Sequence, residues 1–355
     1  MDNILKLLKA GCDINIVEAM QHIDANGKGI LFIVDSSNKL IGCLSDGDIR
    51  RWIIKTGDLS QKIGSIMNIS PKYVENDERC FALELLDKYK INAIPVVDKE
   101  HKLIDVIFKK EFSETGKHEF SNALSKVPII IMAGGKGTRL YPYTKILPKP
   151  LIPISGIPIV ERIMERFCEY GAEHFYMTVN YKKSMIKSYF AETDHNYNIS
   201  YVDEDVPLGT AGSIRLIERE FHEPVIITNC DILIQSSYDD IYHYHIKSCN
   251  DITIVAALKN IEIPYGILHS KEDGIVISME EKPNLSYFIN TGMYIVNGKI
   301  LEKIPENTVF HMTDLVNTVM KEDLKVGLYP VSEDSFLDMG EFEEMNRMEE
   351  KLQIK

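Results

Sequence analysis

A glycine-rich segment at residues 133–139 is the part of the chain whose residue types most directly suggest a chemistry. It reads Ala-Gly-Gly-Lys-Gly-Thr-Arg and follows an apolar run, Val-Pro-Ile-Ile-Ile-Met, at residues 127–132. Glycines permit a tight turn and let the backbone approach a polyphosphate, while Lys136 and Arg139 add fixed positive charge. The segment is not a P-loop, because the spaced Gly-Lys-Ser/Thr is missing, and it is not a GxGxxG loop, because Leu140 stands where the last glycine belongs. These residues alone leave a phosphate site and a purely structural turn both open.

Strands and helices alternate around this segment. Residues 159–167 carry an apolar face at helical spacing, and residues 175–179, 225–228 and 252–256 are short apolar runs typical of buried strands. This alternation predicts an α/β domain with a doubly wound, Rossmann-like mixed sheet. Ligands of such sheets bind outside the carboxyl ends of the strands, which is where the glycine-rich segment would lie.

The longer segment 132–154 resembles the signature of the sugar-1-phosphate nucleotidyltransferases, also called sugar-nucleotide pyrophosphorylases. After the glycines it continues with Pro-Tyr-Thr-Lys at residues 142–145 and Leu-Pro-Lys-Pro-Leu at residues 147–151. Further motifs extend the resemblance over roughly residues 127–345: Pro-Leu-Gly-Thr-Ala-Gly-Ser at 207–213, Asn-Cys-Asp at 229–231, Glu-Glu-Lys-Pro at 280–283, Asn-Thr-Gly at 290–292 and Leu-Asp-Met-Gly at 337–340.

The resemblance implies roles for the residues at the phosphate end of the site. Arg139 would stabilise the charge on the transferred phosphoryl group, Lys149 would contact the phosphates, and Asp231 would complete the catalytic set. The residues expected to bind the nucleoside triphosphate are Ala133, Gly134, Gly135, Gly137, Thr138, Arg139, Lys149, Gly209 and Thr210.

A magnesium site and a sugar-phosphate site are also implied by the resemblance. Asp231 and Asp338 would be the metal ligands, and two carboxylates together with substrate phosphates suit Mg²⁺. An aspartate at the end of a strand is also a common turn former, so either residue taken alone would be weak support. The residues expected at the sugar phosphate are Tyr265, Gly266, Glu281, Lys282, Asn290, Thr291 and Gly292.

The first 120 residues contain an internal repeat with an offset of 63. Val-Asp at 34–35 and Lys-Leu-Ile at 39–41 recur as Val-Asp at 97–98 and Lys-Leu-Ile at 102–104. In each copy a helical pattern precedes two apolar strands that are joined by a polar turn. We predict a duplicated α/β module with copies at about 1–60 and 61–120, a linker at 121–126, and a second domain at 127–355.

The repeat resembles a tandem pair of cystathionine-β-synthase (CBS) domains, most closely in Gly-Cys-Leu-Ser-Asp-Gly-Asp at 42–48. The resemblance implies that Ser45 and Asp48 bind the phosphate and ribose of an adenine nucleotide, and a plain helix N-cap is the alternative role. In the second copy Phe108 and Glu111 hold these positions, and Phe108 cannot supply a hydroxyl group. CBS pairs commonly associate face to face, so we expect a homo-oligomer.

Composition and charge exclude several classes of partner. The 355 residues include 40 Lys and Arg against 53 Asp and Glu, and the resulting charge of −13 disfavours nucleic acid and anionic membranes as partners. The start, Met-Asp-Asn-Ile-Leu, has no basic region typical of a signal peptide, and no apolar run approaches a membrane span. The six cysteines form no CxxC pair. We therefore expect a cytoplasmic protein that binds neither nucleic acid nor membrane.

Together the resemblances imply an enzyme that transfers a nucleoside monophosphate from a triphosphate to a sugar 1-phosphate. A CBS pair ahead of such a domain resembles bacterial enzymes of nonulosonic (legionaminic) acid pathways, so GTP and glucosamine 1-phosphate are the expected substrates of a guanylyltransferase. Uridylyl or thymidylyl transfer to another hexose 1-phosphate is the alternative within the class. A non-catalytic adenine-nucleotide sensor is the alternative of another class, and it would have lost some of the motif residues that are all present here.

Overall fold

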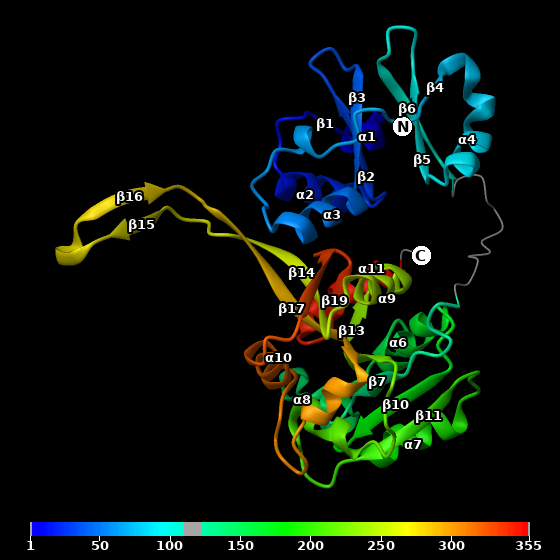
Figure 1. Cartoon of the computed structure of the whole chain (residues 1–355), viewed down its shortest axis with the longest axis vertical. Coiled ribbons are helices and arrows are strands. Elements are labelled where there is room, and N and C mark those ends of the chain that lie inside the picture. The colour runs from blue at the N-terminus through cyan, green and yellow to red at the C-terminus, as the bar shows by residue number, and fades with distance from the viewer. Residues whose placement is uncertain (1, 110–121, 354–355) are drawn as a thin grey trace. The chain divides into compact units, whose positions relative to one another are not determined.

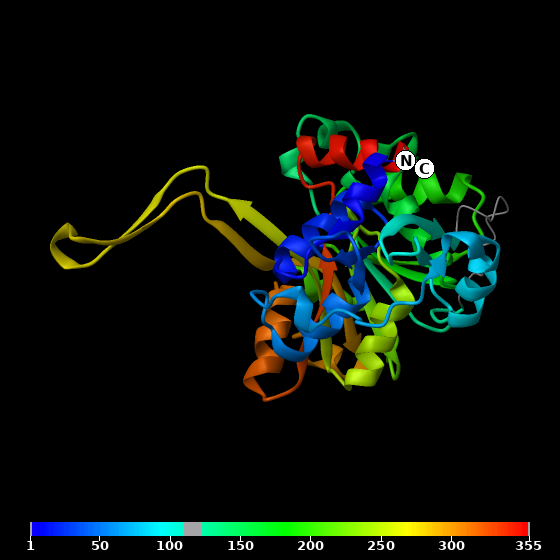
Figure 2. The same ribbon diagram turned by 90° about the horizontal axis from the view of Figure 1, so that it is seen from above.

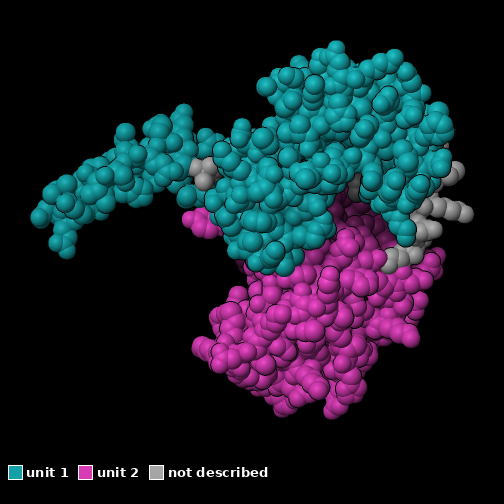
Figure 3. Space-filling view, turned by 45° about the horizontal axis from the view of Figure 1, so that its top comes forward, with its two compact units in different colours: residues 1–118, 261–286 teal, residues 119–260, 287–355 magenta. Residues whose placement is uncertain are grey.

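The computed structural model describes residues 2–109 and 122–353, which form two compact units (Figure 3). One unit comprises residues 1–118 and 261–286, and the other comprises residues 119–260 and 287–355. Glu111, the predicted boundary at residue 120 and the first residue of the predicted linker lie outside the described residues. Within the described residues, no helix is long and apolar enough to cross a membrane.

The first unit contains two three-stranded sheets with the same topology. In the first sheet β1 (Lys9–Ala10) runs parallel to β2 (Ile30–Val34), which is antiparallel to β3 (Leu40–Ser45). The second sheet repeats this pattern with β4 (Val74–Glu75), β5 (Ala93–Val97) and β6 (Leu103–Phe108). Their helices are α1 (Asp2–Leu7), α2 (Ile16–Asn26), α3 (Asp46–Thr56) and α4 (Ala82–Tyr89).

The offset of the sequence repeat is also the offset of the strand register. Ile30 pairs with Ser45 as Ala93 pairs with Phe108, and each hairpin has its irregularity at the same place, after Ile33 and after Val96. The copies, blue and cyan in Figures 1 and 2, share one buried cluster: Leu8, Phe32, Leu40, Ala93, Val97, Leu103, Val106 and Phe108. Each small sheet therefore completes its core by packing on the other copy.

The second unit is built on a seven-stranded sheet that is mixed, as the sequence predicts. Its strands, in spatial order, are β11 (Asn198–Asp203), β10 (His174–Val179), β7 (Ile129–Met132), β12 (Pro224–Asn229), β17 (Asn284–Asn297), β14 (Ile252–Glu262) and β18 (Val326–Ser332). β11, β10, β7 and β12 are parallel to one another, whereas β17 is antiparallel to β12. The carboxyl ends of four parallel strands thus meet at one edge, together with an early part of β17.

Both faces of this sheet are covered. Ile129 and Ile131 belong to a core with α6 (Ile159–Cys168), α7 (Lys183–Glu192) and α9 (Tyr238–Ser248), whereas Ile130 belongs to a core with α10 (Met312–Lys321). This alternation is the two-residue period of a strand buried on both sides. Shorter pieces are α5 (Tyr143–Ile146), α8 (Gly209–Gly212), β8 (Pro153–Ile154) and β9 (Ile157–Pro158), and α11 (Phe342–Gln353) ends the described chain.

Two connecting segments differ from what the sequence predicts. Leu124, within the segment predicted as a linker, is fully buried in the core of the second unit, where its N–H donates to the carbonyl of Tyr170 at 3.0 Å. Residues 261–286 include β15 (Ile267–Ser270) and β16 (Val276–Glu280), an exposed antiparallel ribbon drawn in yellow in Figure 1. No pattern noted in the sequence predicts this ribbon.

His245 on α9 is a buried side chain that ties this helix to the sheet. It is 1% exposed, its Nδ1 lies 2.8 Å from Thr253 Oγ1, and its Nε2 lies 3.1 Å from Asn297 Oδ1. Burial lowers the pKa of His245, although the Asn297 hydrogen bond and Asp251 act in the opposite direction. The folded protein therefore favours the neutral ring.

We expect His245→Gln to destabilise the protein by roughly 1–3 kcal/mol at pH 7.5, because buried hydrogen bonds are lost. Because the folded pKa lies below the unfolded value of about 6.5, the unfolded chain binds the proton first as the pH falls. The stability that His245 contributes is thus present above about pH 6.5 and declines below it. In calorimetric melts from pH 7.5 to 5.5, the difference between wild type and variant should narrow towards acid.

The exposed His243 of the same helix provides the control for this prediction. His243→Gln should leave the pH dependence of the wild type in place. A gap between wild type and the His245 variant that stays constant or widens towards pH 5.5 would contradict the account.

Candidate active site

The glycine-rich loop leaves the sheet at the carboxyl end of β7, the third of its seven strands. β7 ends at Met132, which lies in register with Thr178 of β10 and Asn229 of β12. The Ala133 N–H donates to the carbonyl of Thr178 at 3.0 Å and its side chain is buried in the core. The next residues form the loop, so the sheet itself fixes where the loop begins.

The second predicted nucleotide segment lies at the amino end of α10. The carbonyl of Phe310 accepts from the N–H groups of Ala211 and Gly212 at 2.9 and 3.0 Å. Thr210 Oγ1 accepts from the N–H of Met312 at 3.0 Å. These bonds hold α8 against α10, with Gly209 and Thr210 facing the cavity described below.

Lys149 and Asp231 form an ion pair that joins two separate motifs of the sequence. Lys149 Nζ donates to Asp231 Oδ2, and the two side chains are 12% and 13% exposed. Asp231 follows the last residue of β12, Asn229, by two positions, so the strand end carries its carboxylate to the edge of the sheet. The pair places a fixed cation and a carboxylate together with little water around them.

A small ribbon brings Asp338 next to Asp231. β13 (Ile232–Ile234) pairs with β19 (Phe336–Asp338) so that Ile232 lies opposite Asp338, and the Met339 N–H donates to the carbonyl of Asp231 at 2.8 Å. Burial raises the pKa of Asp338, and the charge of Asp231 raises it further against the opposing effects of Lys149 and Arg139. Two carboxylates with this much desolvation and mutual repulsion fit a site that a divalent cation would neutralise.

Two adjoining cavities lie at this edge of the sheet. The larger, of about 400 Å³, is lined by eight of the nine predicted nucleotide residues, Ala133 being the exception. The smaller, of about 230 Å³, is lined by Asp338 and by the Asn290-Thr291-Gly292 motif. Five residues line both cavities: Met132, Arg139, Thr210, Asn229 and Asp231.

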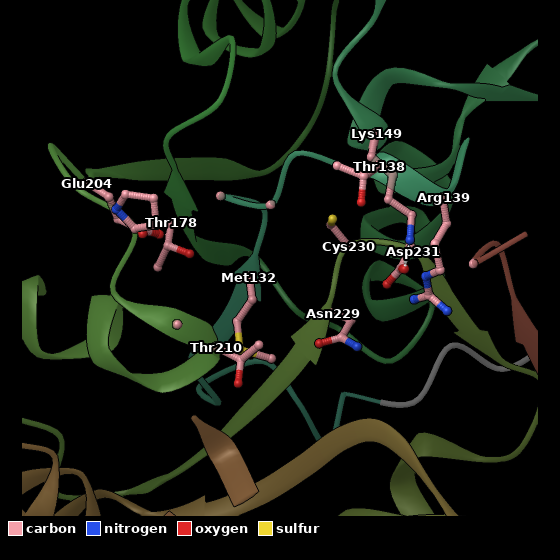
Figure 4. Close-up of a pocket in the computed structure, with 16 residues that line it drawn as sticks. Met132, Thr138, Arg139, Lys149, Thr178, Glu204, Thr210, Asn229, Cys230 and Asp231 are labelled. Carbon is pink, nitrogen blue, oxygen red and sulfur yellow. Dashed lines mark hydrogen bonds and ion pairs between the residues drawn. The ribbon is translucent and has the colours of Figure 1, made fainter. Parts of the chain in front are cut away.

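The side chains that line the larger cavity fall into two groups, and both basic residues are on one side. Figure 4 shows Lys149, Asp231 and Arg139 on one side, with Glu204 and Thr178 on the other. The Arg139 side chain is 66% exposed, and its nearest acidic contact is Glu341 Oε1 at 4.0 Å. Its guanidinium group is therefore available to an anionic ligand.

Four of the predicted sugar-phosphate residues lie on the exposed segment 261–286 of the other unit. They are absent from the residues that line the two cavities, and their assignment stays a prediction: Tyr265, Gly266, Glu281 and Lys282. The remaining three, Asn290, Thr291 and Gly292, are in place because β17 runs antiparallel to β12.

Two residues of the site were missed by sequence reasoning. Glu204, one residue after β11, is only 5% exposed and lines the larger cavity. A Cβ on Gly134 would lie 2.5 Å from its Oε1, so the glycine loop passes directly over this carboxylate. Asn229 lines both cavities. The signal for Glu204 was its place between an apolar strand and the 207–213 motif, three residues before Pro207.

The predicted adenine-nucleotide residues of the first unit form a capping box. Ser45 is the N-cap of α3, its Oγ accepts from the Asp48 N–H at 3.2 Å, and Asp48 Oδ2 accepts from the Ser45 N–H at 2.9 Å. The structure thus shows the helix-capping role that the sequence leaves open. Binding of a nucleotide by the two residues stays a prediction.

Comparisons with known proteins agree with this arrangement. A family model described as nucleotidyl transferase matches residues 128–354, and a CBS domain model matches residues 6–55. The chain therefore belongs to the nucleotidyl transferase family and carries a CBS domain at its amino end. The CBS model covers the first copy of the repeat, whose Ser45 and Asp48 the second copy lacks.

The chain spans only part of the length of the curated relatives that it matches. The chain is 34% identical to a bifunctional protein GlmU of Methanococcus maripaludis over 186 residues, which is 51% of this chain and 42% of that protein. It is 26% identical to a mannose-1-phosphate guanylyltransferase of Mycobacterium tuberculosis over 230 residues, 63% of this chain and 64% of that protein. The solved structure of HddC from Yersinia pseudotuberculosis is 27% identical with a TM-score of 0.50, over 64% of this chain and 99% of that chain.

Asp338→Asn tests whether the carboxylates of Asp231 and Asp338 form a cation-binding site. Because burial and Asp231 both disfavour the charge of Asp338, the neutral variant should melt a few degrees above wild type when EDTA is present. Mg²⁺ with pyrophosphate, which supplies phosphate oxygens, should raise the melting temperature of the wild type and leave that of the variant almost unchanged.

Asp334→Asn, four residues before Asp338 in the sequence, is the contrasting variant. Asp334 accepts from Arg347 at 3.1 Å and also pairs with Lys351, so its loss should lower the melting temperature while the Mg²⁺ response persists. If the Asp338 variant had a lower melting temperature than wild type in the presence of EDTA, the explanation by repulsion between the two carboxylates would be wrong.

Proposed function

We propose that this chain transfers a nucleoside monophosphate from a nucleoside triphosphate to a sugar 1-phosphate, releasing pyrophosphate and forming a nucleoside diphosphate sugar. The observation that carries the proposal is the pair of adjoining cavities. They share a charged wall, called the common wall below, which is formed by the five residues that line both cavities. The larger suits a nucleotide and the smaller a sugar phosphate, and Arg139 and Asp231 line both. Two phosphorylated substrates would meet at that wall.

The chemistry that this wall supports is an in-line displacement. An oxygen of the sugar 1-phosphate attacks the α-phosphorus, and the bond to the pyrophosphate oxygen breaks, so the pyrophosphate leaves with that electron pair. Such transfers depend on positioning and on charge neutralisation. Lys149 and Arg139 stabilise the phosphate oxygens, and Asp231 and Asp338 are the residues that would hold Mg²⁺. When bound, Mg²⁺ neutralises phosphate charge and helps to orient the reacting groups.

Glu204 supports guanine as the base. Guanine presents two adjacent donors, N1–H and the N2 amino group, and a carboxylate can accept from both at once. Uracil and thymine present one N–H between two carbonyl oxygens, and adenine and cytosine place a ring acceptor beside their amino group. Burial raises the pKa of Glu204, while the backbone N–H of Leu208 and the hydroxyls of Ser213 and Thr178 oppose that rise. A buried carboxylate gains most from a ligand with two donors.

On the sugar side we propose glucosamine 1-phosphate, which would make the product GDP-glucosamine for nonulosonic (legionaminic) acid formation. This choice of sugar rests on the combination of a CBS region with a transferase domain. Guanylyl transfer is also the activity in the name of one relative, a mannose-1-phosphate guanylyltransferase. Asn290 in the smaller cavity is a neutral group that an amino or hydroxyl substituent could meet.

Pyrophosphate release by the purified chain with Mg²⁺ tests the proposal. GTP, UTP, CTP, dTTP and ATP would each be paired with the 1-phosphates of glucosamine, N-acetylglucosamine, glucose and mannose. We expect the fastest release with GTP and glucosamine 1-phosphate. Preference for UTP or dTTP would overturn the guanine assignment and leave the transferase intact, whereas no release from any pair would overturn the transferase proposal.

Glu204→Gln tests the base assignment at one residue. The amide keeps the size of the side chain and replaces one acceptor by a donor, which faces a guanine donor unfavourably. We expect kcat/KM for GTP to fall roughly 100-fold and the preference for GTP over UTP to shrink by a similar factor.

The adjacent Asp203 gives a matched control for the loss of one acidic charge. Its carboxylate is exposed, pairs with Lys187 at 2.7 Å, and lies outside the larger cavity. Asp203→Asn should keep the wild-type base preference. Unchanged GTP preference in Glu204→Gln would show that another group reads the base.

A further inference from the structure

Asn229 occupies a place that the family resemblance did not single out. It is the last residue of β12, in register with Met132 of β7, and it lines both the larger and the smaller cavity. Among the described residues its side-chain amide has no hydrogen-bond partner, although its backbone carbonyl accepts from Thr228 Oγ1 at 3.2 Å. Figure 4 shows the amide lying on the cavity wall below Asp231.

The backbone opposite is shaped to admit this amide. Gly292 of β17 has φ +88°, and a Cβ at this position would overlap the Nδ2 and Cγ atoms of Asn229. The antiparallel register, with Thr228 opposite Met293, brings the two residues together. A left-handed glycine at this point therefore leaves the space that Asn229 fills, which couples the 290–292 motif to the end of β12.

Three of the other four residues of the common wall are apolar, ion-paired or hydrogen-bonded. Asp231 pairs with Lys149, and the hydroxyl of Thr210 accepts from the N–H of Met312. Met132 is apolar, and Arg139 carries the positive charge. Asn229 is the neutral hydrogen-bonding group of this wall whose amide is unused among the described residues. Phosphate oxygens only accept hydrogen bonds, and two carboxylates already lie close by.

We propose that Asn229 binds the acceptor substrate, with its amide NH₂ donating a hydrogen bond to the phosphate of the sugar 1-phosphate in the smaller cavity. The inference rests on the proposed function and adds a substrate-binding residue to it. A neutral donor at this point holds the acceptor phosphate against the common wall without a second cation competing with Lys149 for Asp231. The triphosphate, held by the glycine loop and Lys149, depends on it far less.

Steady-state kinetics of Asn229→Ala and Asn229→Asp would test this, using the substrate pair that the wild type turns over fastest. The alanine variant loses the donor, so KM for the sugar 1-phosphate should rise roughly tenfold, while KM for the triphosphate stays within about twofold. The aspartate variant also places a like charge against the phosphate, so its KM for the sugar 1-phosphate should rise roughly 100-fold or more.

Asn198→Asp is the matched control for the added charge. Asn198 is exposed at the start of β11, and since β11, β10, β7 and β12 are parallel it lies at the opposite edge of the sheet. This variant should keep both KM values of the wild type. Calorimetric titration of GMP-PNP, a triphosphate analogue, should give similar Kd values for the wild type and both Asn229 variants.

Which of the two Asn229 variants has the higher KM for the sugar 1-phosphate decides the outcome. If Asn229 instead accepted a hydrogen bond from a sugar hydroxyl, aspartate would retain the acceptor and be less damaging than alanine, and the proposal would be wrong. An equal rise in both KM values would also overturn it, since that would place Asn229 at the triphosphate.

A binding measurement separates this proposal from the proposed function. Titration of glucosamine 1-phosphate into protein holding Mg²⁺ and the α,β-methylene analogue of GTP, whose α–β bridge cannot be cleaved, involves no turnover. Weaker binding in the order wild type, alanine, aspartate would support the role of Asn229 even if no pair released pyrophosphate. Equal binding by all three proteins would reject that role while leaving the transferase proposal to its own assay.

Discussion

The site depends on one constraint, the double pairing of β12. On one side β12 is parallel to β7, and on the other it is antiparallel to β17. A parallel neighbour delivers its carboxyl end to the same edge as β12, so the glycine loop after β7 and Asp231 emerge side by side. An antiparallel neighbour delivers its earlier residues to that edge, so Asn290, Thr291 and Gly292 arrive there too. Had β17 been parallel, the 290–292 motif would lie at the opposite edge of the sheet, away from Asp231. The change of direction at this one strand is thus what allows two cavities to share a wall.

The charges at this wall differ from the net charge of the chain. The net charge of −13 cannot attract a triphosphate, so binding must come from local groups. Lys149 is one such group, and its ammonium group is paired with Asp231. Asp338 adds a second, poorly solvated carboxylate, and burial together with the charge of Asp231 raises its pKa. A cation bound between the carboxylates would relieve that repulsion and release Lys149 towards phosphate.

Much of this arrangement was predictable, and what was missed has a common cause. Short apolar runs and glycine-rich punctuation identified the sheet, its mixed α/β class and the loop after β7, because these are local patterns. The repeat offset of 63 predicted two equal sheets for the same reason, although their shared core could only be expected in outline. Glu204 and Asn229 were missed because their roles arise from register and burial. A glutamate before a Pro-Leu-Gly motif resembles a solvated loop residue until β11 places it under Gly134. The ribbon at 267–280 was missed because its two strands lie outside the packed cores, so neither has a buried face that would impose an alternating pattern.

The first unit shows that a duplicated backbone does not require duplicated chemistry. Asp46 donates its N–H to Gly29 as Lys109 donates to Asn92, so the backbone around the first position of the CBS signature is the same in both copies. At that position, however, Ser45 caps a helix in the first copy, whereas Phe108 is 7% exposed and belongs to the cluster shared by the copies. The Phe108 ring also faces Lys28 Nζ of the first copy at 4.7 Å. The second copy thus uses this position for packing and cation–π attraction, which stabilises the pair of copies. Any ligand binding by the signature residues is therefore expected in the first copy alone, whereas both copies contribute to the shared core.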